Sequence, residues 1–167
     1  MSSQVLSGQR EQAAQAWVRL LRAHAGMTRD FNAELQARHG LTVTDFEALS
    51  RLDESPTRSL RRVDLADKLR LTPSGVTRLL DGLQGAGLVC KESCSTDARV
   101  SYARITDAGR ERLGAAAATH LEALEALFGE RFSPTELSSL SELLGRLPGA
   151  GGEVPPCPGV APDAKEG

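Results

Sequence analysis

Two arginines with polar neighbours are the residues of this chain whose types and spacing best suit a chemical task. Arg78 follows Ser74 by four residues within LTPSGVTRLLDGLQGAGLV at 71–89. Arg99 follows Asp97 by two residues in a short polar segment. A guanidinium offers five N–H donors in a planar fork, and this fork matches phosphate oxygens and the edge of a guanine. The chemistry that these residues favour is recognition of a nucleic acid.

The distribution of charge favours the same chemistry. Residues 58–112 hold 11 Lys/Arg against 7 Asp/Glu, whereas the rest of the chain holds 9 against 15. A basic centre in a chain of net charge −2 indicates a local contact with a polyanion. Chance clustering of charged residues is the alternative explanation.

The segment 71–89 is predicted to be a helix that is anchored on one side. Thr72 is a natural N-cap, and Pro73 suits the first helical position because its missing N–H has no helical partner there. Gly85 and Gly87 end the helix. Its apolar residues recur at helical spacing and predict a buried face: Val76, Leu79, Leu80 and Leu83.

The opposite side of this helix is polar. At about 100° per residue, Ser74, Arg78 and Asp81 fall on one line. Gly75 and Thr77 flank that line, and small residues at a helix N-terminus let the backbone approach a phosphate. Arg78 is the candidate for bidentate hydrogen bonds to a guanine in the major groove. Taken alone, the pattern also fits the solvated face of a surface helix.

A helix-turn-helix followed by a hairpin is predicted around this segment. RRVDLADKLR at 61–70 forms a short helix, LTP makes a break, and LVCKES and VSYARIT form two strands joined by CSTDAR. A hairpin after the second helix is the wing of a winged helix. Near its tip, Arg99 suits a narrow minor groove, and Asp97 orients the guanidinium. An Asp-containing turn with a chance arginine is the alternative.

Helices on both sides of this region complete the fold class, which is mainly α with a small β-hairpin wing. Apolar spacing predicts a long amphipathic helix over about 9–38. Thr42, Thr106 and SPTE at 133–136 mark the starts of three further helices.

Several classes of protein are excluded by the sequence. No apolar run reaches the roughly 20 residues that span a bilayer, and no signal peptide is recognisable, so a cytoplasmic protein is expected. Cys90, Cys94 and Cys157 have no CxxC spacing, so neither a disulfide framework nor a metal site is expected. No nucleophile elbow, P-loop or dinucleotide motif is present, so neither enzymatic activity nor a cofactor is expected.

Together these segments resemble the multiple-antibiotic-resistance regulator (MarR) family of bacterial winged-helix repressors. LADKLRLTPSGVTRLLDGLQGAGLV is similar to the family's helix-turn-helix. DARVSYARIT is similar to its wing signature, Asp-x-Arg followed by Leu-Thr, with Ile105 in place of the leucine. DAGRERL resembles the start of the long helix that follows. The resemblance covers about residues 12–147, and its most specific part is 61–113.

The resemblance implies a homodimer that binds a pseudo-palindromic operator in double-stranded DNA, with one recognition helix per half-site. Apolar stripes along 17–35, 113–128 and 137–147 agree, because they exceed what a monomer exposes. The resemblance also implies a repressor released by a small anionic aromatic ligand, which shifts the spacing of the two DNA-binding lobes.

The implied organisation has four parts. They are an N-terminal dimerisation helix at 1–41, a winged helix-turn-helix lobe at 42–106, C-terminal dimerisation helices at 107–147 and a flexible, Pro- and Gly-rich tail at 148–167. The candidate DNA-contacting residues are Thr72, Ser74, Gly75, Thr77, Arg78, Asp97 and Arg99, with Arg61 and Arg62 of RSLRR as phosphate contacts.

Two alternatives to this function stay open. One is a winged-helix module that binds protein and not DNA. The other is a thiol redox regulator using Cys90 and Cys94, because Lys91 favours a thiolate beside it and an oxidised pair distorts the hairpin. The peroxide-sensing branch of the family uses a cysteine in the first helix, which this chain lacks.

Overall fold

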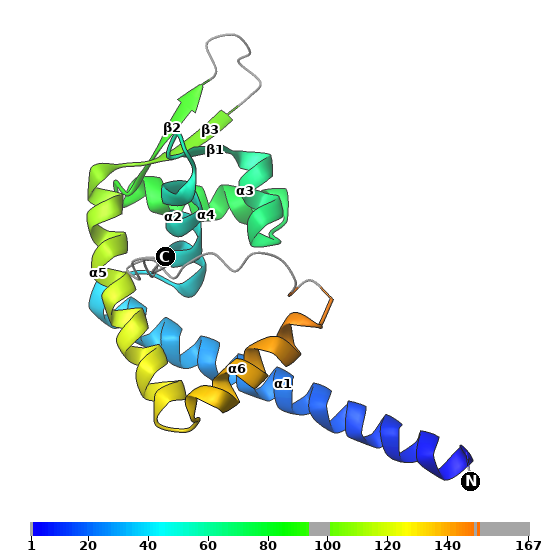
Figure 1. Cartoon of the computed structure of the whole chain (residues 1–167). Helices are drawn as coiled ribbons and strands as arrows, with labels where there is room; N and C mark the ends of the chain where they lie inside the picture. The colour runs from blue at the N-terminus through cyan, green and yellow to red at the C-terminus, as the bar shows by residue number, and fades with distance from the viewer. Residues whose placement is uncertain (1, 94–100, 149, 151–167) are drawn as a thin grey trace, which may run out of the picture.

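The computed structural model describes residues 2–93, 101–148 and 150 of the 167-residue chain. Figure 1 shows α2, α3, α4 and a small sheet gathered at one end of α5, with α1 and α6 at the other end. The elements in chain order are α1 (Ser2–His39), α2 (Val43–Glu54), β1 (Ser59–Arg61), α3 (Arg62–Leu69), α4 (Pro73–Gly85), β2 (Val89–Ser93), β3 (Ser101–Ile105), α5 (Asp107–Leu124), a π-helical turn (Glu125–Gly129) and α6 (Pro134–Gly145). The predicted fold class, mainly α with a wing, is confirmed.

The helix starts follow the predicted caps. The Thr42 and Asp45 side chains form the predicted capping box at the start of α2, and Ser133 with Glu136 does the same for α6. The Thr106 side chain accepts a hydrogen bond from the backbone N–H of Gly109 at the start of α5. Each such cap contributes about 1 kcal/mol, so these local signals fix where the helices begin.

A core shared by α2, α3, α4, α5 and the sheet holds the lobe together. Leu49, Leu52 and Leu65 are completely buried in it. Burial of one leucine stabilises the fold by about 1.5–3 kcal/mol. The other large core residues are Leu35, Leu41, Phe46, Val76, Leu80, Leu83, Leu88, Val89, Ile105 and Leu113.

The wing belongs to a three-stranded antiparallel sheet of order β1-β3-β2. The hairpin of β2 and β3 is confirmed, with Cys90 opposite Arg104. The strand β1, whose Leu60 pairs with Ala103, was not predicted from the sequence. Three residues are too few to show the alternation of apolar and polar residues that identifies a strand in a sequence. The segment is a strand because its backbone pairs with the free edge of β3. The wing loop, with Asp97 and Arg99, lies outside the described residues.

Three boundaries differ from the prediction or lie beyond the described residues. α1 begins at Ser2 and not near residue 9, and the predicted helix after Thr106 changes to a π-helical turn after Leu124. Except for Pro148 and Ala150, the predicted flexible tail lies outside the described residues. The division of the chain into four functional parts stays a prediction.

The helices α1, α2 and α5 meet at His120. Its imidazole lies edge-on to Phe31, with ring centroids 4.9 Å apart, and 5.1 Å from the ring of Phe46. Burial lowers the pKa of His120, while the carboxylate of Glu34 acts in the opposite direction. Burial therefore favours the neutral form of this ring, which is part of the packing that joins α1 to the lobe.

Gly109 brings the first turn of α5 against the chain that leads into β2. A Cβ at this position would lie 2.2 Å from the carbonyl oxygen of Leu88 and 2.8 Å from Cγ1 of Ile105. The Gly109→Ala variant is therefore expected to lower the free energy of unfolding by about 1–3 kcal/mol. Urea denaturation of both proteins measures the difference.

Gly114→Ala is the matched control, because it changes the same residue type in the same helix. No atom lies within 4 Å of a Cβ built at Gly114. Alanine there is expected to leave stability unchanged or to raise it by up to about 1 kcal/mol through helix propensity. A Gly109→Ala protein as stable as wild type contradicts the close packing of α5 on Leu88.

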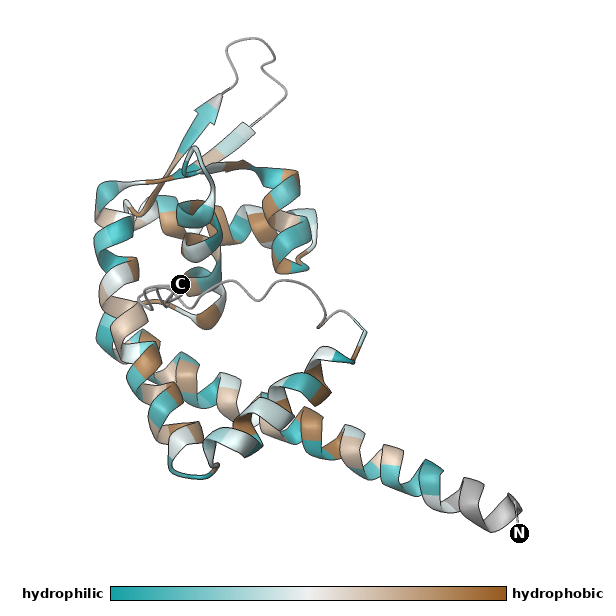
Figure 2. Ribbon diagram, in the orientation of Figure 1, coloured by the Kyte–Doolittle hydropathy of each residue, from teal (hydrophilic) through white to brown (hydrophobic). Residues whose placement is uncertain are grey.

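Large apolar side chains remain exposed on α1 and near α6. Figure 2 shows hydrophobic residues recurring along both helices. Trp17 is 60% exposed and Leu143 is 56% exposed. The others are Val18, Leu21, Phe132, Leu144 and Leu147. Among the described residues, no helix is both long and apolar enough to cross a membrane.

Candidate nucleic-acid interface

The core anchors one side of α4, which we call the recognition helix. Val76, Leu80 and Leu83 are almost completely buried, as the apolar spacing predicts. Ser74 and Arg78 are exposed on the other side. The predicted division of this helix into an anchored and a polar side is therefore confirmed.

The N-terminus of the recognition helix is closed by Thr72. Its hydroxyl accepts a hydrogen bond from the backbone N–H of Gly75 at 3.1 Å and lies 3.2 Å from the hydroxyl of Ser74. A Cβ on Gly75 would lie 3.2 Å from the same hydroxyl, a tight contact. Thr72 is therefore first a helix cap, and Gly75 keeps space for that cap. Their contacts with DNA stay predictions.

Arg78 is the exposed cation of this helix. Within the described parts of the chain, its guanidinium has no hydrogen bond and no ion pair. None of its five N–H donors has a partner among the described residues, so they are available to a ligand.

Asp81 is paired with the wing. Its carboxylate lies 2.9 Å from Nζ of Lys91 on β2, and both side chains are about half exposed. This pair offsets a negative charge that would otherwise repel a phosphate backbone. It also joins the recognition helix to the strand that leads into the wing.

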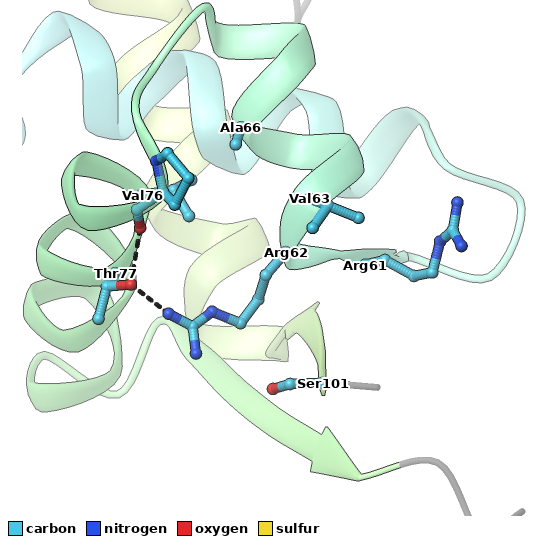
Figure 3. Close-up of a pocket in the computed structure, with 8 residues that line it drawn as sticks. Arg61, Arg62, Val63, Ala66, Val76, Thr77 and Ser101 are labelled. Atoms are coloured by element: carbon cyan, nitrogen blue, oxygen red, sulfur yellow. Dashed lines mark hydrogen bonds between the residues drawn. The ribbon is translucent and has the colours of Figure 1, made fainter. Parts of the chain in front are cut away.

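Arg62 and Thr77 lie against each other, as Figure 3 shows. Arg62 donates a hydrogen bond from its guanidinium to Oγ1 of Thr77. The Thr77 hydroxyl in turn donates to the carbonyl oxygen of Pro73 at 2.8 Å. The sequence analysis assigned both residues to DNA contacts and did not anticipate this bond between α3 and α4.

Arg61 is also engaged within the chain. Its Nε and a terminal nitrogen donate to the two carboxylate oxygens of Asp64, at 2.7 and 2.8 Å. These hydrogen bonds raise the pKa of Arg61 and lower the pKa of Asp64. In Figure 3 the Arg61 guanidinium points away from that of Arg62. A phosphate contact by Arg61 would compete with Asp64.

The base of the wing is held by Arg104, which the sequence analysis did not single out. Its guanidinium donates to the carboxylate of Glu92 on β2 and, at 2.9 Å, to the carbonyl oxygen of Thr57. The hydrogen bond to Glu92 raises the pKa of Arg104. The register of β3 with both of its neighbours, which places Cys90 and Ser59 on either side of Arg104, brings these groups together.

The thiols and the wing tip are only partly described. Cys90 is half-buried on β2 and has no disulfide. Cys94, Asp97 and Arg99 lie outside the described residues, so the predicted minor-groove contact and the redox pair stay predictions. Among the described residues, no group of His, Cys, Asp and Glu is placed to hold a metal ion.

A cavity of about 350 Å³ lies between the N-terminal ends of α3 and α4. Val63, Ala66 and Val76 form apolar parts of its lining, and Arg62 and Thr77 cross one side of it. The gap shows that side-chain packing does not fill the space between these two helix ends.

Comparisons with known proteins agree with this geometry. Residues 41–101 match the family model described as the MarR family. The HTH-type transcriptional regulator MhqR of Bacillus subtilis is 26% identical over 137 residues, which cover 82% of this chain and 92% of that protein.

Two solved structures from Streptomyces coelicolor have similar folds. Sco3205, a MarR family transcriptional regulator in complex with DNA, is 28% identical with a TM-score of 0.74, over 80% of this chain and 83% of that one. AbsC, a MarR family transcriptional regulator, is 29% identical with a TM-score of 0.71, over 78% and 88%. The residues matched by the family model contain the recognition helix and β2, and they end at the first residue of β3.

Proposed function

The chain belongs to the MarR family of transcriptional regulators, and we propose that it is a dimeric repressor that binds an operator in double-stranded DNA. The observation that carries the proposal is the recognition helix. Its buried side fixes it to the lobe, while Ser74 and Arg78, which has no partner among the described residues, are exposed. A helix of this kind fits the major groove, where a guanine offers two acceptors to a guanidinium fork.

The proposed contacts divide into base reading and positioning on the backbone. Arg78 reads a base edge, Ser74 contacts the backbone or a neighbouring base, and the helix end around Gly75 approaches a phosphate. On the wing, Arg99 enters the adjacent minor groove with its guanidinium oriented by Asp97. The solved complex of Sco3205 with DNA supports a DNA-binding role for this fold.

A homodimer is proposed because α1 and the region of α6 have large apolar side chains that the described residues do not cover. Trp17, Leu21 and Leu143 are each about half exposed or more. Large apolar side chains exposed on two helices in this way favour a protein interface. Two recognition helices related by a two-fold axis then match a pseudo-palindromic operator with half-sites about one DNA turn apart.

Release by a small anionic aromatic ligand is the regulatory part of the proposal. Its support is the family resemblance, which implies a ligand held between the dimer helices and the DNA-binding lobe. Such a ligand releases DNA if it binds better to a conformation whose lobe spacing does not fit the operator. A regulator of this kind acts in the cytoplasm, where bacterial DNA lies.

The proposal is tested by selecting DNA with the wild-type protein from a library of duplexes with a randomised centre. The most enriched sequence, called the selected duplex below, is compared with a scrambled duplex of the same composition by fluorescence anisotropy. We expect the selected duplex to bind about 10³-fold more tightly or better. Its affinity should also fall steeply with salt, with a slope of about −0.9 for each phosphate neutralised. Failure to enrich any sequence, or binding insensitive to salt, contradicts the proposal and favours a protein-binding module.

The wing contact makes a separate prediction. Arg99→Ala is expected to weaken binding to the selected duplex by roughly 1–3 kcal/mol without loss of the dimer. Arg29→Ala is the control, because the one partner of Arg29 among the described residues is its exposed neighbour Asp30 on α1. Exposed pairs of this kind contribute little. Equal affinity of the Arg99→Ala and wild-type proteins in a gel-shift titration removes the wing from the DNA contact.

A further inference from the structure

The bond between Arg62 and Thr77 joins the two helices of the helix-turn-helix. Arg62 is the first residue of α3 and is half-buried, and Thr77 lies in the second turn of the recognition helix. The guanidinium donates to the Thr77 hydroxyl, and this hydroxyl donates to the carbonyl oxygen of Pro73 at 2.8 Å. A continuous chain of hydrogen bonds therefore runs from α3 to the first turn of the recognition helix.

These bonds occupy the groups that a DNA contact by Thr77 would need. A hydroxyl has one O–H to donate, and the oxygens of a phosphate act only as acceptors. Since the Thr77 proton is directed to Pro73, Thr77 can bind a phosphate only if that hydrogen bond breaks. Within the described residues, neither Ser74 nor Arg78 donates a side-chain hydrogen bond to a backbone carbonyl as Thr77 does.

The cavity explains why this bond matters for position. Its lining includes Val63 and Ala66 on α3 and Pro73 and Val76 on α4. Ala66 and Val76 are buried and pack the two helices together, whereas the hollow beside them leaves the outer part of this contact without facing atoms. At this end of the helix pair, the Arg62–Thr77 bond crosses the gap that packing leaves open.

We infer that Arg62 is a positioning residue that holds the recognition helix in register through Thr77, and that neither side chain reads DNA itself. Thr77 directly precedes Arg78, so a rotation or shift of this turn displaces the Arg78 guanidinium relative to a base edge. The inference rests on the proposed function, because it concerns how the recognition helix is presented to an operator. It replaces the predicted phosphate contact of Arg62 and the predicted DNA contact of Thr77.

A positioning role and a phosphate role differ in measurable ways. A phosphate contact contributes equally to all sequences and adds about one unit to the salt slope. A positioning residue supports only the binding that depends on the position of Arg78. Its substitution therefore lowers the preference for the selected duplex and does not change the salt slope.

The experiment compares Arg62→Ala, Thr77→Val, the double variant and Thr77→Ser on the selected and scrambled duplexes over a salt series. Valine keeps the shape of threonine without its hydroxyl, whereas serine keeps the hydroxyl. We expect Arg62→Ala and Thr77→Val each to lose about 10-fold in affinity for the selected duplex, the cost of a hydrogen bond to a charged group. The scrambled duplex should bind all variants equally, with unchanged salt slopes. The double variant should be no weaker than either single variant, and Thr77→Ser should bind like wild type.

Three results overturn the inference. They are an Arg62→Ala protein that loses affinity for both duplexes equally with a shallower salt slope, additive losses in the double variant, or a Thr77→Ser protein as weak as Thr77→Val. If thermal unfolding shows that Arg62→Ala does not fold, the comparison of Thr77→Val with Thr77→Ser tests the inference. The inference is then overturned if both variants have the same affinity for the selected duplex. A wild-type protein with no preference between the duplexes contradicts the proposed function itself, before any variant is compared.

Discussion

Leu21→Glu is expected to convert the protein to a monomer and to lower its affinity for the selected duplex about 100-fold or more. Leu21 is 48% exposed and lies on the same stretch of α1 as the exposed Trp17 and Val18. A glutamate there places two like charges in the proposed dimer interface, where desolvation of each charge is costly. In a dimer, binding of one lobe to its half-site holds the second lobe close to the other half-site. This linkage raises the affinity by about 10²–10⁴-fold, and a monomer loses it.

The chain itself should remain folded in this variant, because the Leu21 side chain is not part of the core. Sedimentation velocity measures the mass, and circular dichroism checks the helix content. Gln15→Glu is the matched control, since it adds the same charge at an exposed polar position of α1 and should leave a dimer. A Leu21→Glu protein that still sediments as a dimer places the interface elsewhere.

Arg78→Ala is expected to remove most of the preference for the selected duplex. A bidentate pair between arginine and guanine discriminates by about 1–3 kcal/mol, and a dimer contains two such pairs. Arg78 has no competing partner within the described residues, so the variant should lose contacts with DNA and none within the chain. Its thermal stability should therefore match that of wild type.

Arg78→Lys separates base reading from charge. Lysine keeps the positive charge but lacks the planar fork, so it binds a phosphate as a point charge and reads a guanine poorly. We expect the lysine variant to bind the scrambled duplex like wild type and the selected duplex like Arg78→Ala. If Arg78→Lys retains the full preference, Arg78 acts on the backbone and another residue reads the base.

The parts of this protein that were predictable from sequence are those with local causes. The starts of α2, α4, α5 and α6 are set by a hydroxyl cap directly before the helix, and the Thr42–Asp45 box shows this directly. The anchored side of the recognition helix follows from helical spacing alone, as the burial of Val76, Leu80 and Leu83 confirms. Local hydrogen bonds and helical periodicity need no knowledge of the rest of the fold.

The missed features depend on residues that are distant in sequence. Strand β1 forms only because β3 pairs with it, and the contact of Arg104 with the carbonyl oxygen of Thr57 spans 47 positions. The basic segment RSLRR suggested two phosphate contacts, yet the structure pairs Arg61 with Asp64 and Arg62 with Thr77. A count of charges cannot reveal such pairing, because it does not show which cations already have partners.

The central claim is that the recognition helix reads the major groove through Arg78. Methylation of guanine N7 places a methyl group in that groove at the atom that the guanidinium would contact. Interference analysis on the selected duplex is therefore the most direct test. We predict that methylation of one guanine in each half-site blocks binding of the wild-type protein and has no effect on the residual binding of Arg78→Ala. Wild-type binding that tolerates methylation of every guanine, or an unchanged interference pattern with Arg78→Ala, contradicts the claim.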